Sequence, residues 1–210
     1  MSSLAAGDPH GTTETTGKAV HPVWVRVCHW TNAAAMVVMV MSGWQIYNAS
    51  PLFNFVFPPG VTLGGWLGGG LLWHFAAMWL LTVNGIVYVI LGLATGRFRR
   101  KLSPLNASGV VTDARAALTG RLRHDDLSKY NQVQKLMYAG ILIVGALVVL
   151  SGLSIWKPVQ FQYLTALFGG YDTARYVHFF AMSAIVLFTI LHTVMALLVP
   201  KSLRAMLIGR

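Results

Sequence analysis

The sequence predicts an all-α integral membrane protein, a bundle of four transmembrane helices with both chain termini in the cytoplasm. The first reason is composition, since 55% of the 210 residues are hydrophobic and only 10% are charged. The second is the presence of four apolar stretches, each long enough to cross a bilayer, which takes about 20 residues in a helix. The third is the uneven distribution of basic residues among the connections, which indicates the orientation of the bundle.

The apolar stretches divide the chain into a tail and one domain. The predicted spans cover about residues 25–46, 71–93, 134–156 and 174–199. Residues 1–22 are rich in Thr, Gly and Ala and show no apolar periodicity, so we expect a cytoplasmic tail there. Residues 23–210 then form a single four-helix domain.

The basic residues set the predicted topology. The net charge is +10, and of the 16 lysines and arginines only Lys157 and Arg175 lie outside the N-terminal segment, the loop between the second and third spans, and the C-terminus. An excess of Lys and Arg marks the cytoplasmic side of a membrane protein. We therefore interpret the charge as a topology signal on a protein surrounded by lipid and expect no nucleic acid as a partner.

Histidines occur in three of the four spans. The first span carries His29 about one turn from its cytoplasmic start, and an uncharged aromatic connection at residues 48–70 leads to the second span with His74 at its external end. The third span holds no histidine. The fourth span carries His178 near its start and His192 near its end.

The two histidines of the fourth span face the same way. Their separation of 14 residues advances a helix by about 21 Å and turns it within ~40° of four whole turns. They therefore lie one in each leaflet. With the N-terminus inside, His29 lies at the depth of His192, and His74 lies at the depth of His178.

Two depth-matched histidine pairs are what two six-coordinate haems require. We predict two haem b groups with bis-histidine ligation, by His29 and His192 in the cytoplasmic leaflet and by His74 and His178 in the external one. The lone cysteine, Cys28, excludes an internal disulfide and an iron–sulfur cluster, and no Cys-x-x-Cys-His run exists for covalent haem attachment.

Two alternatives to haem ligation apply to the same histidines. In the first, each ring serves only a neighbouring backbone carbonyl or a transport path, as single membrane histidines do. Non-haem iron or copper is disfavoured because its ligands converge on one point. Gly43, 14 residues after His29, has two explanations: it leaves room for the edge of the second haem, or it promotes helix contact.

The chain resembles the di-haem cytochrome b subunits of membrane-bound formate dehydrogenases and nickel–iron hydrogenases, over nearly its whole length. The residues that carry this resemblance are Cys28-His29-Trp30, His74, the run Lys-Tyr-Asn-Gln-Val-Gln-Lys at residues 129–135, the His178–His192 pair, and Lys-Ser-Leu-Arg-Ala-Met at residues 201–206.

The resemblance implies a four-helix bundle with cytoplasmic termini in a bacterial inner membrane. It implies the same histidine pairing, with His74 and His178 on the periplasmic side. It also implies that a quinone reacts beside the cytoplasmic-side haem, near Asn131 and Gln134. Those two side chains have an alternative interpretation as helix-end caps.

The function expected from this resemblance is that of a membrane-anchoring electron-transfer subunit. Electrons would pass between a periplasmic molybdenum-cofactor or iron–sulfur oxidoreductase and the quinone pool. A second hypothesis is a stand-alone membrane enzyme in which a small external molecule such as superoxide reacts at the outer haem. A third, less favoured, is a non-redox anchor or transporter. The resemblance leaves the donor open.

Overall fold

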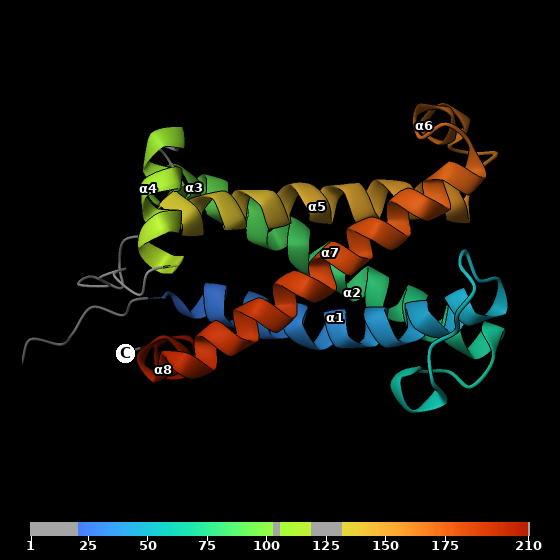
Figure 1. Ribbon diagram of the computed structural model, residues 1–210, viewed down its shortest axis with the longest axis horizontal. Coiled ribbons are helices and arrows are strands. Elements are labelled where there is room, and N and C mark those ends of the chain that lie inside the picture. Colours follow the sequence, from blue (N-terminus) through green and yellow to red (C-terminus); the bar gives the residue numbers. More distant parts are fainter. Residues whose placement is uncertain (1–20, 103–105, 119–131, 210) are drawn as a thin grey trace, which may run out of the picture.

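The computed structural model describes residues 21–102, 106–118 and 132–209, and within them it contains helices and no strands (Figure 1). Four helices are long: α1 (Val23–Ala49), α2 (Leu67–Ala94), α5 (Gln132–Trp156) and α7 (Tyr171–Leu198). The short ones are η1 (Pro59–Val61), α3 (Arg97–Leu102), α4 (Ala107–Leu118), α6 (Gln162–Leu167) and α8 (Pro200–Ile208).

The four long helices are each apolar and long enough to cross a membrane, so a multi-pass membrane protein with four spans is confirmed for the described chain. They coincide with the predicted spans but begin two to four residues earlier. Helix ends depend on local capping and loop geometry, which hydropathy does not report.

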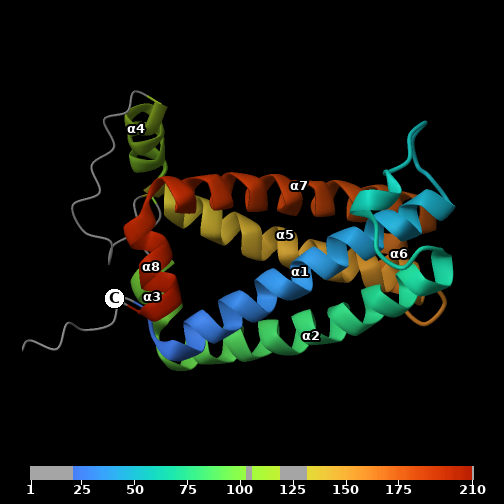
Figure 2. The ribbon, with the colours of Figure 1, turned by 90° about the horizontal axis from the view of Figure 1, so that it is seen from below.

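The long helices pack as two antiparallel pairs, α1 with α2 and α5 with α7. Figure 2 shows the two pairs on opposite sides of the bundle, most clearly separated toward the end at which α1 begins. Helices α3, α4 and α8 gather at that end, and α6 and the α1–α2 connection lie at the other (Figure 1). We call these the basic end, for Arg97, Arg99, Arg115, Lys201 and Arg204, and the aromatic end, for Phe53, Phe55, Phe57 and Trp66.

At the aromatic end, rings from the α1–α2 connection join the two pairs. The Phe53 ring lies 5.3 Å from that of Phe179 on α7, and the Tyr47 ring of α1 lies 5.3 Å from the same phenylalanine. Arg175 of α7 adds a hydrogen bond to the carbonyl oxygen of Ser50, which follows α1. The uncharged aromatic connection is therefore a tertiary contact between the helix pairs.

At the basic end, α8 joins the pairs. Pro200 starts this helix, where its missing N–H costs nothing, and Gly209 follows it with φ 86°, the left-handed conformation that glycine adopts freely. Arg26 of α1 donates a hydrogen bond of 2.9 Å to the carbonyl oxygen of Leu207 on α8. The segment after α7 is thus a helix across the end of the bundle.

Candidate functional site

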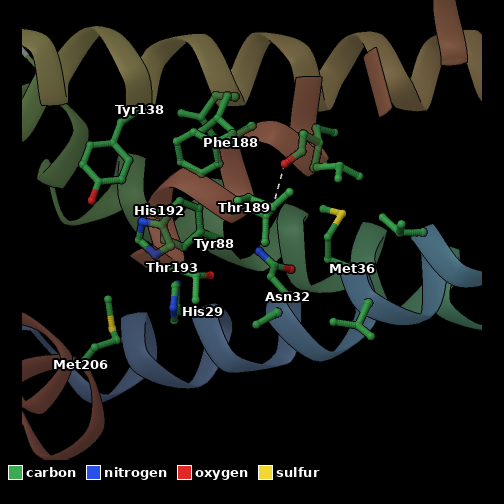
Figure 3. Close-up of a pocket in the computed structure, with 18 of the residues that line it drawn as sticks. His29, Asn32, Met36, Tyr88, Tyr138, Phe188, Thr189, His192, Thr193 and Met206 are labelled. Carbon is green, nitrogen blue, oxygen red and sulfur yellow. Dashed lines mark hydrogen bonds between the residues drawn. The ribbon is translucent and has the colours of Figure 1, made fainter. Parts of the chain in front are cut away.

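A cavity of about 650 Å³ separates the two helix pairs toward the basic end. Its volume is in the range of about 300–1,000 Å³ that is usual for ligand and cofactor sites. Most of its lining is apolar and comes from α1 and α7, with contributions from α2, α3, α5 and α8. The lining residues labelled in Figure 3 are His29, Asn32, Met36, Tyr88, Tyr138, Phe188, Thr189, His192, Thr193 and Met206.

His29 and His192 face each other in this cavity from opposite helix pairs (Figure 3). His29 lies six residues after the start of α1, and His192 lies six residues before the end of α7. Their ring centroids are 5.9 Å apart, with the planes at 65°. His192 also stacks on Phe188, at 5.7 Å between centroids. We call His29 and His192 the inner pair.

The other two membrane histidines, the outer pair, lie toward the aromatic end. His74 is seven residues into α2, and His178 is seven residues into α7. They therefore lie at one level of the bundle, on helices of opposite pairs. Neither of them lines the 650 Å³ cavity. The structure brings His29 and His192 together and places His74 and His178 at one level on opposite helix pairs, and only the inner pair lines this cavity.

Each outer histidine is fixed through Nδ1 by the neighbouring helix of its own pair. Nδ1 of His74 lies 3.1 Å from the carbonyl oxygen of Met39 and 3.1 Å from Oγ of Ser42, both on α1. A carbonyl oxygen only accepts hydrogen bonds, so Nδ1 carries the proton and donates. The second nitrogen, Nε2, then keeps its lone pair.

His178 repeats this arrangement on the other helix pair. Its Nδ1 lies 3.0 Å from the carbonyl oxygen of Val148 and 3.1 Å from Oγ of Ser151, both on α5. A metal-binding histidine typically donates one ring N–H to a carbonyl and binds through the other nitrogen. Both outer histidines are thus held in the tautomer that a haem iron requires.

Two glycines make room for the outer imidazoles. A Cβ atom added to Gly43 would lie 3.4 Å from Cε1 of His74, and one added to Gly152 would lie 3.2 Å from Cε1 of His178. The sequence left two explanations for Gly43, room for the edge of a second haem or close helix contact. Its nearest neighbour in the structure is the candidate ligand itself, so the space it leaves is occupied by the ring of His74.

The candidate donors suit a porphyrin better than a bare ion. Among the described residues, no three His, Cys, Asp or Glu side chains come together as a metal site. Paired imidazoles are the donor set of an axially ligated haem, whereas a non-haem ion needs a larger converging set. The residues present fit two bis-histidine haems.

The predicted quinone residues are placed only in part. Gln134 lies in the first turn of α5 at the basic end and is not part of the cavity lining. Asn131 lies outside the described residues. His21, which the sequence placed in a cytoplasmic segment, lines the cavity and accepts a hydrogen bond of 3.1 Å from Arg97.

Sequence reasoning missed a polar contact inside the membrane. Asn84 of α2 donates to the carbonyl oxygen of Cys28 at 2.8 Å and to Oδ1 of Asn32 at 2.6 Å. Asn32 lines the cavity one turn beyond His29. An asparagine within an apolar span is the signal that points to such a contact, because its amide needs a partner in lipid.

Comparisons with known proteins identify the family of the chain and one relative. The family model described as prokaryotic cytochrome b561 matches residues 20–209. The chain is 51% identical over 191 residues to an Azospira oryzae protein named "Putative protein-methionine-sulfoxide reductase subunit YedZ1", covering 91% of this chain and 96% of that protein. No solved structure matches the chain significantly.

Proposed function

Because the chain belongs to the prokaryotic cytochrome b561 family, whose members bind haem b in the membrane, we propose that it conducts electrons across the bilayer through two haem b groups. The inner pair, His29 and His192, would hold one group, and the outer pair, His74 and His178, the other. Haem b supplies reversible one-electron transfer when bound.

The observation that carries this proposal is the arrangement of four histidines at two levels, with one histidine of each level on each helix pair. In each outer histidine Nδ1 donates a hydrogen bond, so the lone pair of Nε2, on the other side of the ring, points away from the hydrogen-bonded side. At the mouth of the inner cavity, Arg97 supplies a positive charge for the carboxylates of a haem. The lining of the cavity is mostly apolar, as is usual for a cofactor site.

We propose that the basic end lies in the cytoplasm and the aromatic end in the periplasm of a bacterial inner membrane. The support is the excess of Lys and Arg at the basic end. A quinone would then react near the inner pair, with Gln134 and Asn131 as its candidate contacts. These residues lie at or directly before the start of α5.

The proposed partner is a periplasmic protein-methionine-sulfoxide reductase. The support is the printed name of the Azospira oryzae relative, whose length the match covers almost completely. Reduction of one sulfoxide to a thioether consumes two electrons and two protons and releases water. Oxidation of one quinol to a quinone supplies two electrons through the haems and releases two protons at the quinone site. The sulfoxide takes up two protons on the periplasmic side, so electrons and protons balance overall. We also propose that this partner carries a molybdenum cofactor or an iron–sulfur centre.

The first test is haem content and its dependence on single histidines. The purified chain is expected to contain two haem b per polypeptide. The His178→Ala variant should lose mainly the outer haem and His192→Ala mainly the inner one, because each ligand serves one level of the bundle. Extracted haem per protein and reduced-minus-oxidised spectra measure both effects.

Several outcomes would contradict the proposal. A colourless wild-type protein would refute the haem assignment, and equal loss of both haems in both folded variants would refute the two-level pairing.

The partner is tested by adding a quinol and an oxidised-methionine protein to the co-isolated complex. Sulfoxide reduction that does not require this chain would refute the partner assignment.

A further inference from the structure

The outer site is built from one arrangement that occurs twice. The first helix of each pair carries a Ser-Gly dipeptide, Ser42-Gly43 on α1 and Ser151-Gly152 on α5, and the second helix carries the histidine. In both cases the serine and the carbonyl three residues before it lie within 3.1 Å of Nδ1. The glycine leaves room for the ring. The two helix pairs thus supply matching halves of this site.

Each serine hydroxyl has its own hydrogen committed elsewhere. Oγ of Ser42 lies 2.6 Å from the carbonyl oxygen of Val38, and Oγ of Ser151 lies 2.7 Å from that of Leu147. A hydroxyl has one hydrogen and two lone pairs, so a hydroxyl that donates to its own helix offers Nδ1 an acceptor. Both serines are fully buried, at 0% exposure, so no water competes for that acceptor.

The N–H of each outer histidine therefore meets two acceptors, the hydroxyl and the carbonyl. The inner pair differs, because within the described part of the chain no hydrogen bond reaches a ring nitrogen of His29 or His192. Acceptors on the non-bonding nitrogen of a metal-binding histidine make the ring a stronger electron donor. A stronger donor stabilises ferric relative to ferrous iron.

We propose that Ser42 and Ser151 are positioning residues for the outer haem, which hold His74 and His178 as the Nδ1–H tautomer and lower that haem's midpoint potential. This inference rests on the proposed function, because it requires haem b at the outer site. It adds to that function two equivalent side chains that would act on the outer haem through its histidine ligands.

The experiment uses the full-length purified protein and redox titration of its haem absorption. The variants are Ser42→Ala, Ser151→Ala and the double replacement. The matched control is Ser154→Ala, since Ser154 is also fully buried on α5 and donates to the carbonyl oxygen of Leu150 but, within the described residues, makes no hydrogen bond to a histidine. The outer haem's signal is identified as the one missing in His74→Ala.

Each single alanine variant is expected to raise the outer haem's midpoint potential and leave the inner one unchanged, and the double variant to raise it further. The carbonyl acceptors remain, so haem stays bound but dissociates about ten times faster. The low-spin ferric resonance spectrum of the outer haem should change as its rings gain freedom. Ser42→Cys and Ser151→Cys preserve packing with a weak acceptor and should give the same direction of shift.

The inference is overturned if the alanine and cysteine variants leave the outer potential where Ser154→Ala leaves it, or if both haems shift equally. Wild-type protein that lacks an outer haem would instead refute the proposed function. The two failures are therefore distinguishable in the same set of titrations.

Discussion

At the residue scale, the fit of glycine against imidazole differs between the two outer histidines. An added Cβ at Gly43 would meet His74 at 3.4 Å, an ordinary van der Waals distance, whereas one at Gly152 would meet His178 at 3.2 Å. The ring of His178 cannot retreat freely, because its Nδ1 is already hydrogen-bonded to the carbonyl oxygen of Val148. The same substitution should therefore have unequal effects at two equivalent positions.

We predict that Gly152→Ala weakens outer haem binding by about tenfold, as disturbance of a ligand's support commonly does, and that Gly43→Ala leaves it nearly unchanged. Haem retention after dilution into excess apomyoglobin measures the difference. Gly145→Ala is the control, because nothing lies within 4 Å of its added Cβ. Equal retention in Gly152→Ala and Gly145→Ala would show that the close approach to His178 is unimportant.

At the element scale, the contact between α1 and α2 contains a polar link in the middle of an apolar interface. Asn84 donates to both the backbone of Cys28 and the side chain of Asn32, so it fixes the rotation of α2 relative to α1. That rotation decides which face of α1 carries His29 toward the cavity. Interhelical hydrogen bonds in membranes contribute modestly, about 0.6 kcal/mol on average.

We expect a double-mutant cycle of Asn32→Ala and Asn84→Ala to give a coupling energy of roughly 0.5–1.5 kcal/mol, measured by unfolding in mixed detergents. Val83→Ala is the control, because Val83 neighbours Asn84 in sequence but is 57% exposed. Additive effects of the two asparagine replacements would mean that the hydrogen bond between them does not stabilise the helix pair.

At the scale of the whole molecule, the two helix pairs are joined at both ends and enclose a cavity between them. Aromatic rings join them at one end, and α8 joins them at the other. This arrangement keeps the pairs apart around the cavity toward the basic end, where a large planar group would fit. Phe53 is central to the aromatic end, since its ring contacts those of Tyr176, Phe179 and Phe180 on α7.

We predict that Phe53→Ala lowers the free energy of unfolding by about 1–2 kcal/mol, because each aromatic pair contributes about 0.5–1.5 kcal/mol and the ring is partly exposed. Loss of the outer haem on heating should occur at a lower temperature, while the inner haem is affected less. Val56→Ala, in the same connection and 62% exposed, is the control. Identical melting of the two variants would contradict a joining role for Phe53.

The sequence by itself determined the four spans, because hydropathy over about 20 residues is a local property of the chain. It also placed the four membrane histidines at two depths, since the rise per residue of a helix and the alternating direction of successive spans are sufficient to assign a depth to each residue. It predicted the family, which the match over residues 20–209 confirms. It did not find the short helix α6 or the extent of α8, whose Pro200 and Gly209 were nevertheless present as start and stop signals.

Only the tertiary structure decided which side chains surround those histidines. The rotation of each helix about its axis and the pairing of α1 with α2 and α5 with α7 depend on packing between segments far apart in sequence. These contacts bring Ser42 to His74, Ser151 to His178 and Asn84 to Asn32. The repeated Ser-Gly dipeptide was visible in the sequence, but its meaning required the histidine of a different helix.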